Sequence, residues 1–167
     1  MRSLLVALGL ALACGSTVSA AQPGWSGLRW LEGDWSAQGG GGPGRASGGF
    51  SFHTEAGGQV LVRRNFADYP AQDGKPASRH DDLMVIYAEG DSTKATYWDS
   101  EGQTIRYAVT TPAPGEAVFV SEAAQGPRFR LSYHATVQGL EGRFEIAPPS
   151  AREVFKTYLT WTAVKAR

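Results

Sequence analysis

Cysteine is nearly absent from this chain of 167 residues, and the one cysteine present is Cys14. A lone thiol cannot form a disulfide within the chain, so the stability of the fold must come from its core. The same shortage excludes iron–sulfur clusters and zinc sites built from several cysteines. Histidine is also scarce, with three residues, His53, His80 and His134.

The chain also lacks basic clusters and any excess charge, because 16 Lys and Arg balance 16 Asp and Glu. Proteins that bind nucleic acid neutralise its phosphates with clustered Lys and Arg, so we do not expect nucleic acid as a partner. Long hydrophobic runs are missing as well. The run at residues 4–13 is too short to span a bilayer, which needs about 20 residues, and we expect no transmembrane segment.

The hydrophobic run at residues 4–13 is instead typical of a secretory signal. Arg2 precedes it, and the small residues Val18 and Ala20 fit a signal-peptidase site before Ala21. We predict a signal peptide over residues 1–20, a single domain over residues 21–167, and a periplasmic or secreted location. A minority alternative is a lipid anchor on Cys14, since residues 12–14 resemble a lipobox whose leucine stands one position too close to the cysteine.

Short strand-like segments separated by turn signals fill the rest of the chain, and no helical pattern of ordinary length interrupts them. About ten segments recur, at residues 33–39, 50–53, 60–66, 83–87, 94–99, 104–110, 117–121, 128–136, 140–147 and 154–165. Short connections favour pairing between sequence neighbours, and closure removes exposed edges. We predict an all-β fold, an antiparallel up-and-down β-barrel of about ten strands, in preference to a sandwich. Residues 28–31 form a short helical plug at one end.

A Gly-x-Trp at Gly33 and Trp35 marks the entry of the first strand. Glycine allows a tight turn there, and the tryptophan ring can cover the closed end of the barrel while its indole N–H bonds a carbonyl.

This motif resembles the first-strand motif of the calycins, the lipocalins and fatty-acid-binding proteins. The ten-strand meander looks most like the nitrobindin-like branch, and residues 61–65, 82–87, 97–102 and 142–146 resemble a family of uncharacterised bacterial lipocalin-like barrels. The resemblance implies an apolar-ligand binder in which Lys165, or Lys156, lies across Trp35 in a cation–π contact. Nitrobindin-like barrels bind haem through a histidine near the last strand. Residues 154–167 contain none, so we expect no cofactor.

The paired arginines of residues 63–64 are the most informative charged residues. Neighbouring side chains of a strand point to opposite faces, so one arginine points inward. We predict that it is Arg64, because Arg64 shares a face with apolar side chains, Val60, Val62 and Phe66. A buried guanidinium needs a partner. The resemblance to fatty-acid-binding proteins makes a ligand carboxylate plausible, and the alternatives are a surface arginine or a structural ion pair with Asp99 or Glu145.

Three tyrosines are candidates for the wall of a ligand cavity, since each shares a strand face with apolar neighbours: Tyr97, Tyr107 and Tyr133. Tyrosine offers apolar area together with a hydroxyl that can orient a ligand. Ordinary core packing is the alternative role.

Metal sites are not expected. Residues 79–82 join His80 to two adjacent aspartates, whose side chains point to opposite faces of a strand and cannot easily share one metal ion. His134 is likewise expected to be an ordinary strand residue rather than a haem or metal ligand.

We therefore predict an exported barrel that binds a small apolar or amphipathic, and possibly anionic, ligand without transforming it. Two alternatives stay open. One is a barrel enzyme of the isomerase or cyclase type, in which Tyr107 or Tyr133 works beside Asp99 or Glu145. The other is a structural envelope module with a filled core.

Overall fold

A computed structural model describes residues 24–72 and 74–166, so the predicted signal peptide and Cys14 lie outside the described residues. Ten antiparallel strands close into one barrel in which each strand pairs with its sequence neighbours and the first pairs with the last. They are β1 (Gly33–Gly41), β2 (Ala46–Glu55), β3 (Val60–Tyr69), β4 (Ser78–Glu89), β5 (Ser92–Asp99), β6 (Thr104–Thr110), β7 (Glu116–Ser121), β8 (Arg128–Thr136), β9 (Gly139–Ala147) and β10 (Lys156–Lys165). The predicted fold class and strand number are confirmed.

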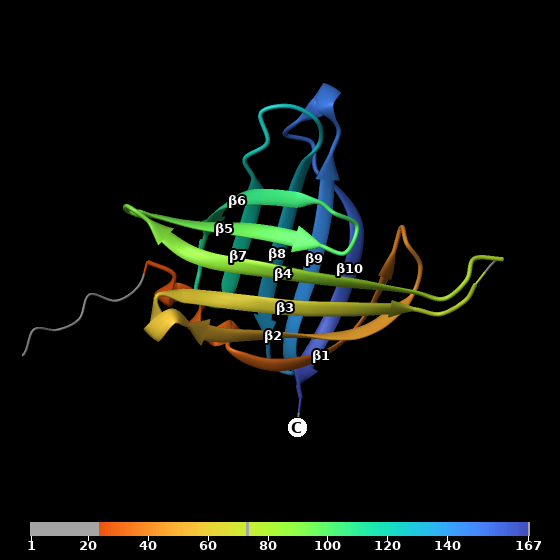
Figure 1. Ribbon diagram of the computed structural model, residues 1–167, viewed down its shortest axis with the longest axis horizontal. Coiled ribbons are helices and arrows are strands. Elements are labelled where there is room, and N and C mark those ends of the chain that lie inside the picture. The colour runs from red at the N-terminus through yellow and green to blue at the C-terminus, as the bar shows by residue number, and fades with distance from the viewer. Residues whose placement is uncertain (1–23, 73, 167) are drawn as a thin grey trace, which may run out of the picture.

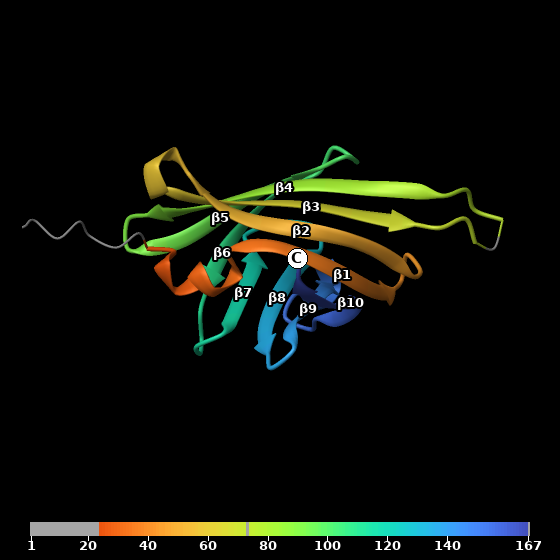
Figure 2. The ribbon, with the colours of Figure 1, turned by 90° about the horizontal axis from the view of Figure 1, so that it is seen from below.

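The barrel is flattened into two layers whose strands cross. In Figure 1, β2–β5 run across the picture in front of β7–β9, which run up and down. Figure 2 shows the two layers edge-on. Within residues 24–72 and 74–166 the helices are three short 3₁₀ turns, η1 (Ser26–Leu31), η2 (Ala56–Gly58) and η3 (Pro149–Ala151). No helix of the described residues has the length and apolar character to cross a membrane.

The predicted plug is the 3₁₀ helix η1, which closes the end of the barrel where β1 begins. Leu28 and Leu31 are fully buried, and Trp25, just before the helix, is buried as well. The indole of Trp25 donates to the carbonyl of Gln59 at 3.1 Å, which ties the plug to the start of β3. Trp25 is a part of the plug that the sequence analysis missed.

The Gly-x-Trp corner has the predicted geometry. Gly33 has φ +107°, a conformation that glycine adopts without strain. Trp35 donates its indole N–H to the Leu31 carbonyl at 2.8 Å. The ammonium of Lys165 lies 4.0 Å from the Trp35 ring centre, so the cation–π contact assigned to Lys165 is confirmed.

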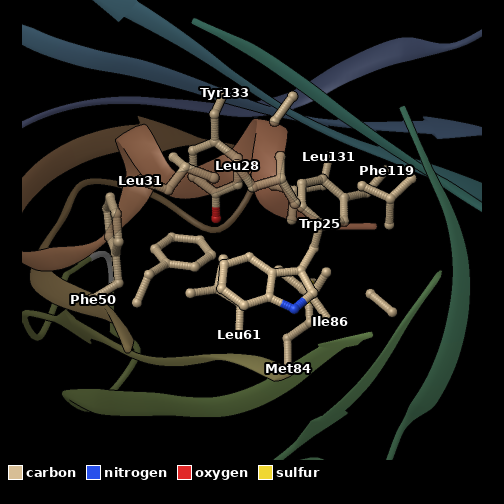
Figure 3. Packing of buried hydrophobic residues seen from close by; sticks show 14 of the residues in the cluster. Trp25, Leu28, Leu31, Phe50, Leu61, Met84, Ile86, Phe119, Leu131 and Tyr133 are labelled. Carbon is tan, nitrogen blue, oxygen red and sulfur yellow. The ribbon is translucent and has the colours of Figure 1, made fainter. Parts of the chain in front are cut away.

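Aromatic rings fill the half of the barrel next to the plug. Phe52, Phe119 and Tyr133 are almost fully buried, and both phenylalanine rings meet Tyr133 edge to face at 5.7 and 6.1 Å. Figure 3 shows Tyr133 above Leu61 and Trp25, with its hydroxyl directed into the packed interior. This half of the lumen is therefore filled, as the alternative of a structural module with a filled core requires for the whole barrel.

The prediction that Arg64 points inward is wrong. Arg63 is 6% exposed and points into the barrel, whereas Arg64 lies on the outer face and pairs with exposed Glu55 at 3.4 Å. The apolar residues that share its face misled the prediction, because Phe66 is itself on the outside. Its ring is covered by the Arg79 guanidinium at 4.3 Å, a surface contact that accounts for an apolar side chain on the polar face.

Candidate functional site

A cavity of about 570 Å³ occupies the half of the barrel opposite the plug. It lies among the end of β1 and the start of β2, the end of β3 and the start of β4, and the end of β9 and the start of β10. Apolar side chains form much of its wall, Phe50, Ile105, Phe129, Leu131, Phe144 and Trp161. The loops that line its mouth are exposed, so the cavity opens to solvent.

The buried charge in this cavity is an ion pair between Arg63 and Asp82. The two side chains are 7% and 4% exposed, and Nη1 of Arg63 lies 2.5 Å from Oδ1 of Asp82. The second carboxylate oxygen, Oδ2, accepts from the Asn65 amide at 2.8 Å. Alternation places all three side chains inside, because β3 and β4 pair in register with Asn65 opposite Asp82.

His80 lies two residues before Asp82 on β4 and therefore faces the same way. One ring nitrogen, Nδ1, is 3.0 Å from the Glu101 carboxylate, and the other, Nε2, is 3.3 Å from Asp82 and 3.2 Å from the Tyr97 hydroxyl. The hydrogen bond to Asp82, joined by Glu101 and opposed by burial, raises the pKa of His80 to about 9. His80 is therefore an imidazolium at neutral pH.

The predicted wall tyrosines all point inward, at different depths. Tyr97 and Tyr107 line the cavity, with ring centres 6.5 Å apart, whereas Tyr133 lies deeper in the packed core. The Tyr97 hydroxyl donates to Asp99 at 3.2 Å. Burial raises the pKa of Tyr97 and Tyr107 well above its usual range and that of Tyr133 to about 12, so all three stay protonated. Ligand binding by these residues stays a prediction.

Several buried polar atoms around the lumen lack a hydrogen-bond partner among the described residues. They include Nε of Arg63, the Tyr133 hydroxyl and Nε1 of Trp161. Each can donate a hydrogen bond, and a buried donor without an acceptor costs free energy. The interior is therefore short of hydrogen-bond acceptors near Arg63 and Trp161, both of which line the cavity.

Removal of the Tyr133 hydroxyl tests this shortage. Tyr133→Phe keeps the ring contacts with Phe52 and Phe119 and deletes a buried hydroxyl that lies beside the Arg63 guanidinium but makes no hydrogen bond of good geometry. We expect the free energy of unfolding to rise by about 1 kcal/mol, measured by urea denaturation. A loss of 1 kcal/mol or more would instead mean that the hydroxyl makes a stabilising bond in solution.

The His80 network predicts a pH dependence of stability. The folded-state pKa of His80, about 9, lies above its unfolded value of 6.5, so its stabilisation is complete below pH 6.5 and is lost as the pH rises through 9. The variant His80→Gln lacks this pH-dependent stabilisation. The difference in unfolding free energy between wild type and variant should shrink by about 3 kcal/mol between pH 6 and pH 10. A pH-independent difference would show that folding does not shift the pKa of His80.

His80 also forms a compact cluster with two carboxylates, a grouping that the sequence analysis did not foresee. Ligand atoms of His80, Asp99 and Glu101 lie within 4.8 Å of one another. Residues 80, 99 and 101 come together because β4 and β5 pair with Asp82 opposite Asp99. Adjacent Asp81 and Asp82 do diverge as expected, but His80 and Asp82, two positions apart, lie on the same face of β4. The absence of a metal stays a prediction.

Two other candidates lie outside the cavity. Glu145 faces away from the lumen and forms a two-pronged ion pair with Arg130, at 2.6 and 2.9 Å. His134 is exposed on the outer face beside Glu116, 3.4 Å away. Neither residue can act on a ligand in the lumen, so the enzyme alternative keeps only Asp99, which bonds Tyr97 rather than Tyr107 or Tyr133.

No protein-family model matches the chain, and no curated protein matches it. The closed ten-strand barrel is consistent with a calycin-like fold.

Proposed function

We propose that this chain is a binding protein that holds one small, mostly apolar molecule in the open half of its barrel without transforming it. The observation that carries the proposal is the cavity of about 570 Å³, walled by aromatic and aliphatic side chains and containing a few buried polar groups. Small-molecule sites typically have this size and this composition. As part of the same proposal, the chain belongs to the calycin superfamily.

The distribution of filled and empty space favours binding over a purely structural role. The plug and the aromatic cluster already close and stabilise one half of the barrel, with Trp25, Leu28 and Leu31 almost fully buried. A structural module would gain stability by filling the other half too, since a cavity forfeits packing contacts. The hollow half, with its polar groups inside, therefore supports a ligand-binding site.

The protonation states of two tyrosines and His80 argue against these three groups as the general base of an enzyme. A general base must be unprotonated near the working pH. The raised pKa values of Tyr97 and Tyr107 keep both hydroxyls protonated, and His80, with its pKa raised to about 9, is protonated as well. These groups are suited to hold and orient a ligand as hydrogen-bond donors.

We also propose that the protein works outside the cytoplasm, in the periplasm or as a secreted protein. The support is the leader-like sequence of residues 1–20, with Arg2, an apolar run and small residues before Ala21. The alternative is that the same leader ends before Cys14, which then carries a lipid anchor. Mass spectrometry of the protein from its native cells distinguishes them by the N-terminal residue and its modification.

Titration with Nile red, a neutral apolar dye, tests the binding function. We expect saturable binding of one dye per chain. Ile105→Trp, which places a large ring at a cavity-lining position of β6, should weaken it at least tenfold. The matched control is Arg106→Trp, at the next position, whose side chain is 59% exposed on the outer face, and it should leave binding unchanged. No saturable binding, or equal loss in both variants, would contradict the proposal.

Native mass spectrometry of protein from its own cells then identifies any copurifying molecule.

A further inference from the structure

We propose that the polar end of the ligand is a neutral hydrogen-bond acceptor, such as the carbonyl of an ester, amide or ketone, and that Asp82 sets this preference by cancelling the charge of Arg63. The inference rests on the proposed binding function and specifies the chemical class of the guest.

The charges of the cavity are already matched within the protein. Two cationic side chains face it, Arg63 and His80, together with three carboxylates, Asp82, Asp99 and Glu101, while Arg79 lies at its outer edge. Arg63 pairs with Asp82, and His80 pairs with Asp82 and Glu101. Arg79 is half exposed and pairs with Asp68 and Asp81. A ligand carboxylate would therefore find no cation without a carboxylate partner in this cavity.

A ligand carboxylate would instead meet repulsion. Asp82 is 4% exposed, and interactions between charges are weakly screened at such a buried position. Asp99 adds a second negative charge. Its carboxylate accepts described hydrogen bonds only from neutral donors, which are the Tyr97 hydroxyl and the backbone N–H groups of Glu101 and Gln103. A second carboxylate beside Arg63 would compete with Asp82 for one guanidinium.

The cavity does offer donors. The Asn65 amide lines it and gives only one of its two N–H groups to Asp82, which leaves the other for a ligand. The Tyr107 hydroxyl, on the same cavity wall, makes no hydrogen bond among the described residues and is a second donor. A neutral carbonyl oxygen satisfies a buried donor and brings no charge toward Asp82. The aromatic walls around these donors suit the apolar remainder of the molecule.

A matched set of twelve-carbon probes tests the inference: dodecanoate, dodecanamide and methyl dodecanoate, each measured by displacement of Nile red at pH 7.5. For the wild type we expect the amide and the ester to bind at least tenfold more tightly than dodecanoate. Asp82→Asn removes the competing carboxylate and leaves the Arg63 charge free. It should tighten dodecanoate at least tenfold while changing the neutral probes little.

Asp68→Asn is the control for this substitution, because Asp68 is a half-exposed carboxylate that pairs with Arg79 rather than with Arg63. It should leave the order of the three probes unchanged. Tighter binding of dodecanoate to the wild type overturns the inference and leaves the binding function intact. A failure of all three probes to displace bound Nile red also overturns the inference and leaves the binding function intact. Absence of Nile red binding overturns the binding function itself. The comparison on the wild type decides the inference even where Asp82→Asn does not fold.

Discussion

Asp82→Ala is expected to lower the free energy of unfolding by about 3–5 kcal/mol, the cost of removing one partner from a buried ion pair. The substitution leaves the Arg63 guanidinium, 6% exposed, without a carboxylate. It also removes the acceptor of the Asn65 amide and one of the acidic neighbours of His80. Urea denaturation of wild type and variant at one pH measures the loss.

An exposed aspartate provides the control for this prediction. Asp68 and Arg79 are both about half exposed and lie 3.3 Å apart, so Asp68→Ala should cost no more than about 0.5 kcal/mol. The double substitution Arg63→Met and Asp82→Leu removes both charges and should recover most of the stability. Equal losses in Asp82→Ala and Asp68→Ala would show that the buried pair is not desolvated in solution.

Gly142→Ala is expected to weaken Nile red binding at least tenfold. Gly142 is on β9 opposite Trp161 of β10, and the indole lies directly over it. A Cβ at Gly142 would come within 2.0 Å of the ring, so the ring must move away from β9 and into the cavity. The variant should also lose about 1–3 kcal/mol of stability, as overpacked positions do.

Two further variants separate loss of space from general damage. Gly40 also lines the cavity, but a Cβ there would meet its nearest atom at 3.6 Å, an ordinary contact, so Gly40→Ala should bind the dye normally. Combining Gly142→Ala with Trp161→Leu restores space and should recover binding. A Gly142→Ala protein that binds as tightly as wild type would mean that the dye occupies some other site.

The strands were predictable because the chain marks its turns with glycine, proline and acidic residues, and the short connections leave sequence neighbours to pair. The closed end was predictable in the same way. Gly33 and Trp35 form a local motif, and the resemblance to calycins supplied Lys165 as the cation above the ring. These features depend on residues close in sequence or on one known contact.

The inward arginine was not predictable from alternation alone. Alternation divides β3 into two faces but does not say which one is the interior. The apolar neighbours of Arg64 favoured the wrong face, because in the structure Phe66 is covered by Arg79 and the interior face carries Arg63 and Asn65. A hollow half-barrel accepts polar side chains inside when they pair with one another, as Arg63 and Asp82 do.

The polar network of the cavity needed the strand register. His80, Asp99 and Glu101 are up to 21 positions apart in the sequence, and His80 meets the other two only because Asp82 lies opposite Asp99 across β4 and β5. A one-residue slip would turn every one of these side chains to the other face. The signal available beforehand was the spacing of two between His80 and Asp82, which places both on one face of a strand.

The most direct test of the hollow barrel is a ¹⁵N–¹H spectrum of the indole groups of the five tryptophans, recorded as Nile red is added. The account predicts that the N–H signal of Trp161, in the cavity wall, shifts in a saturable way. The signals of Trp25 and Trp35, hydrogen-bonded at the closed end, and of Trp98, on the outer surface, should stay in place. A shift of Trp98 without Trp161 would show that the dye binds outside the barrel and would contradict the account.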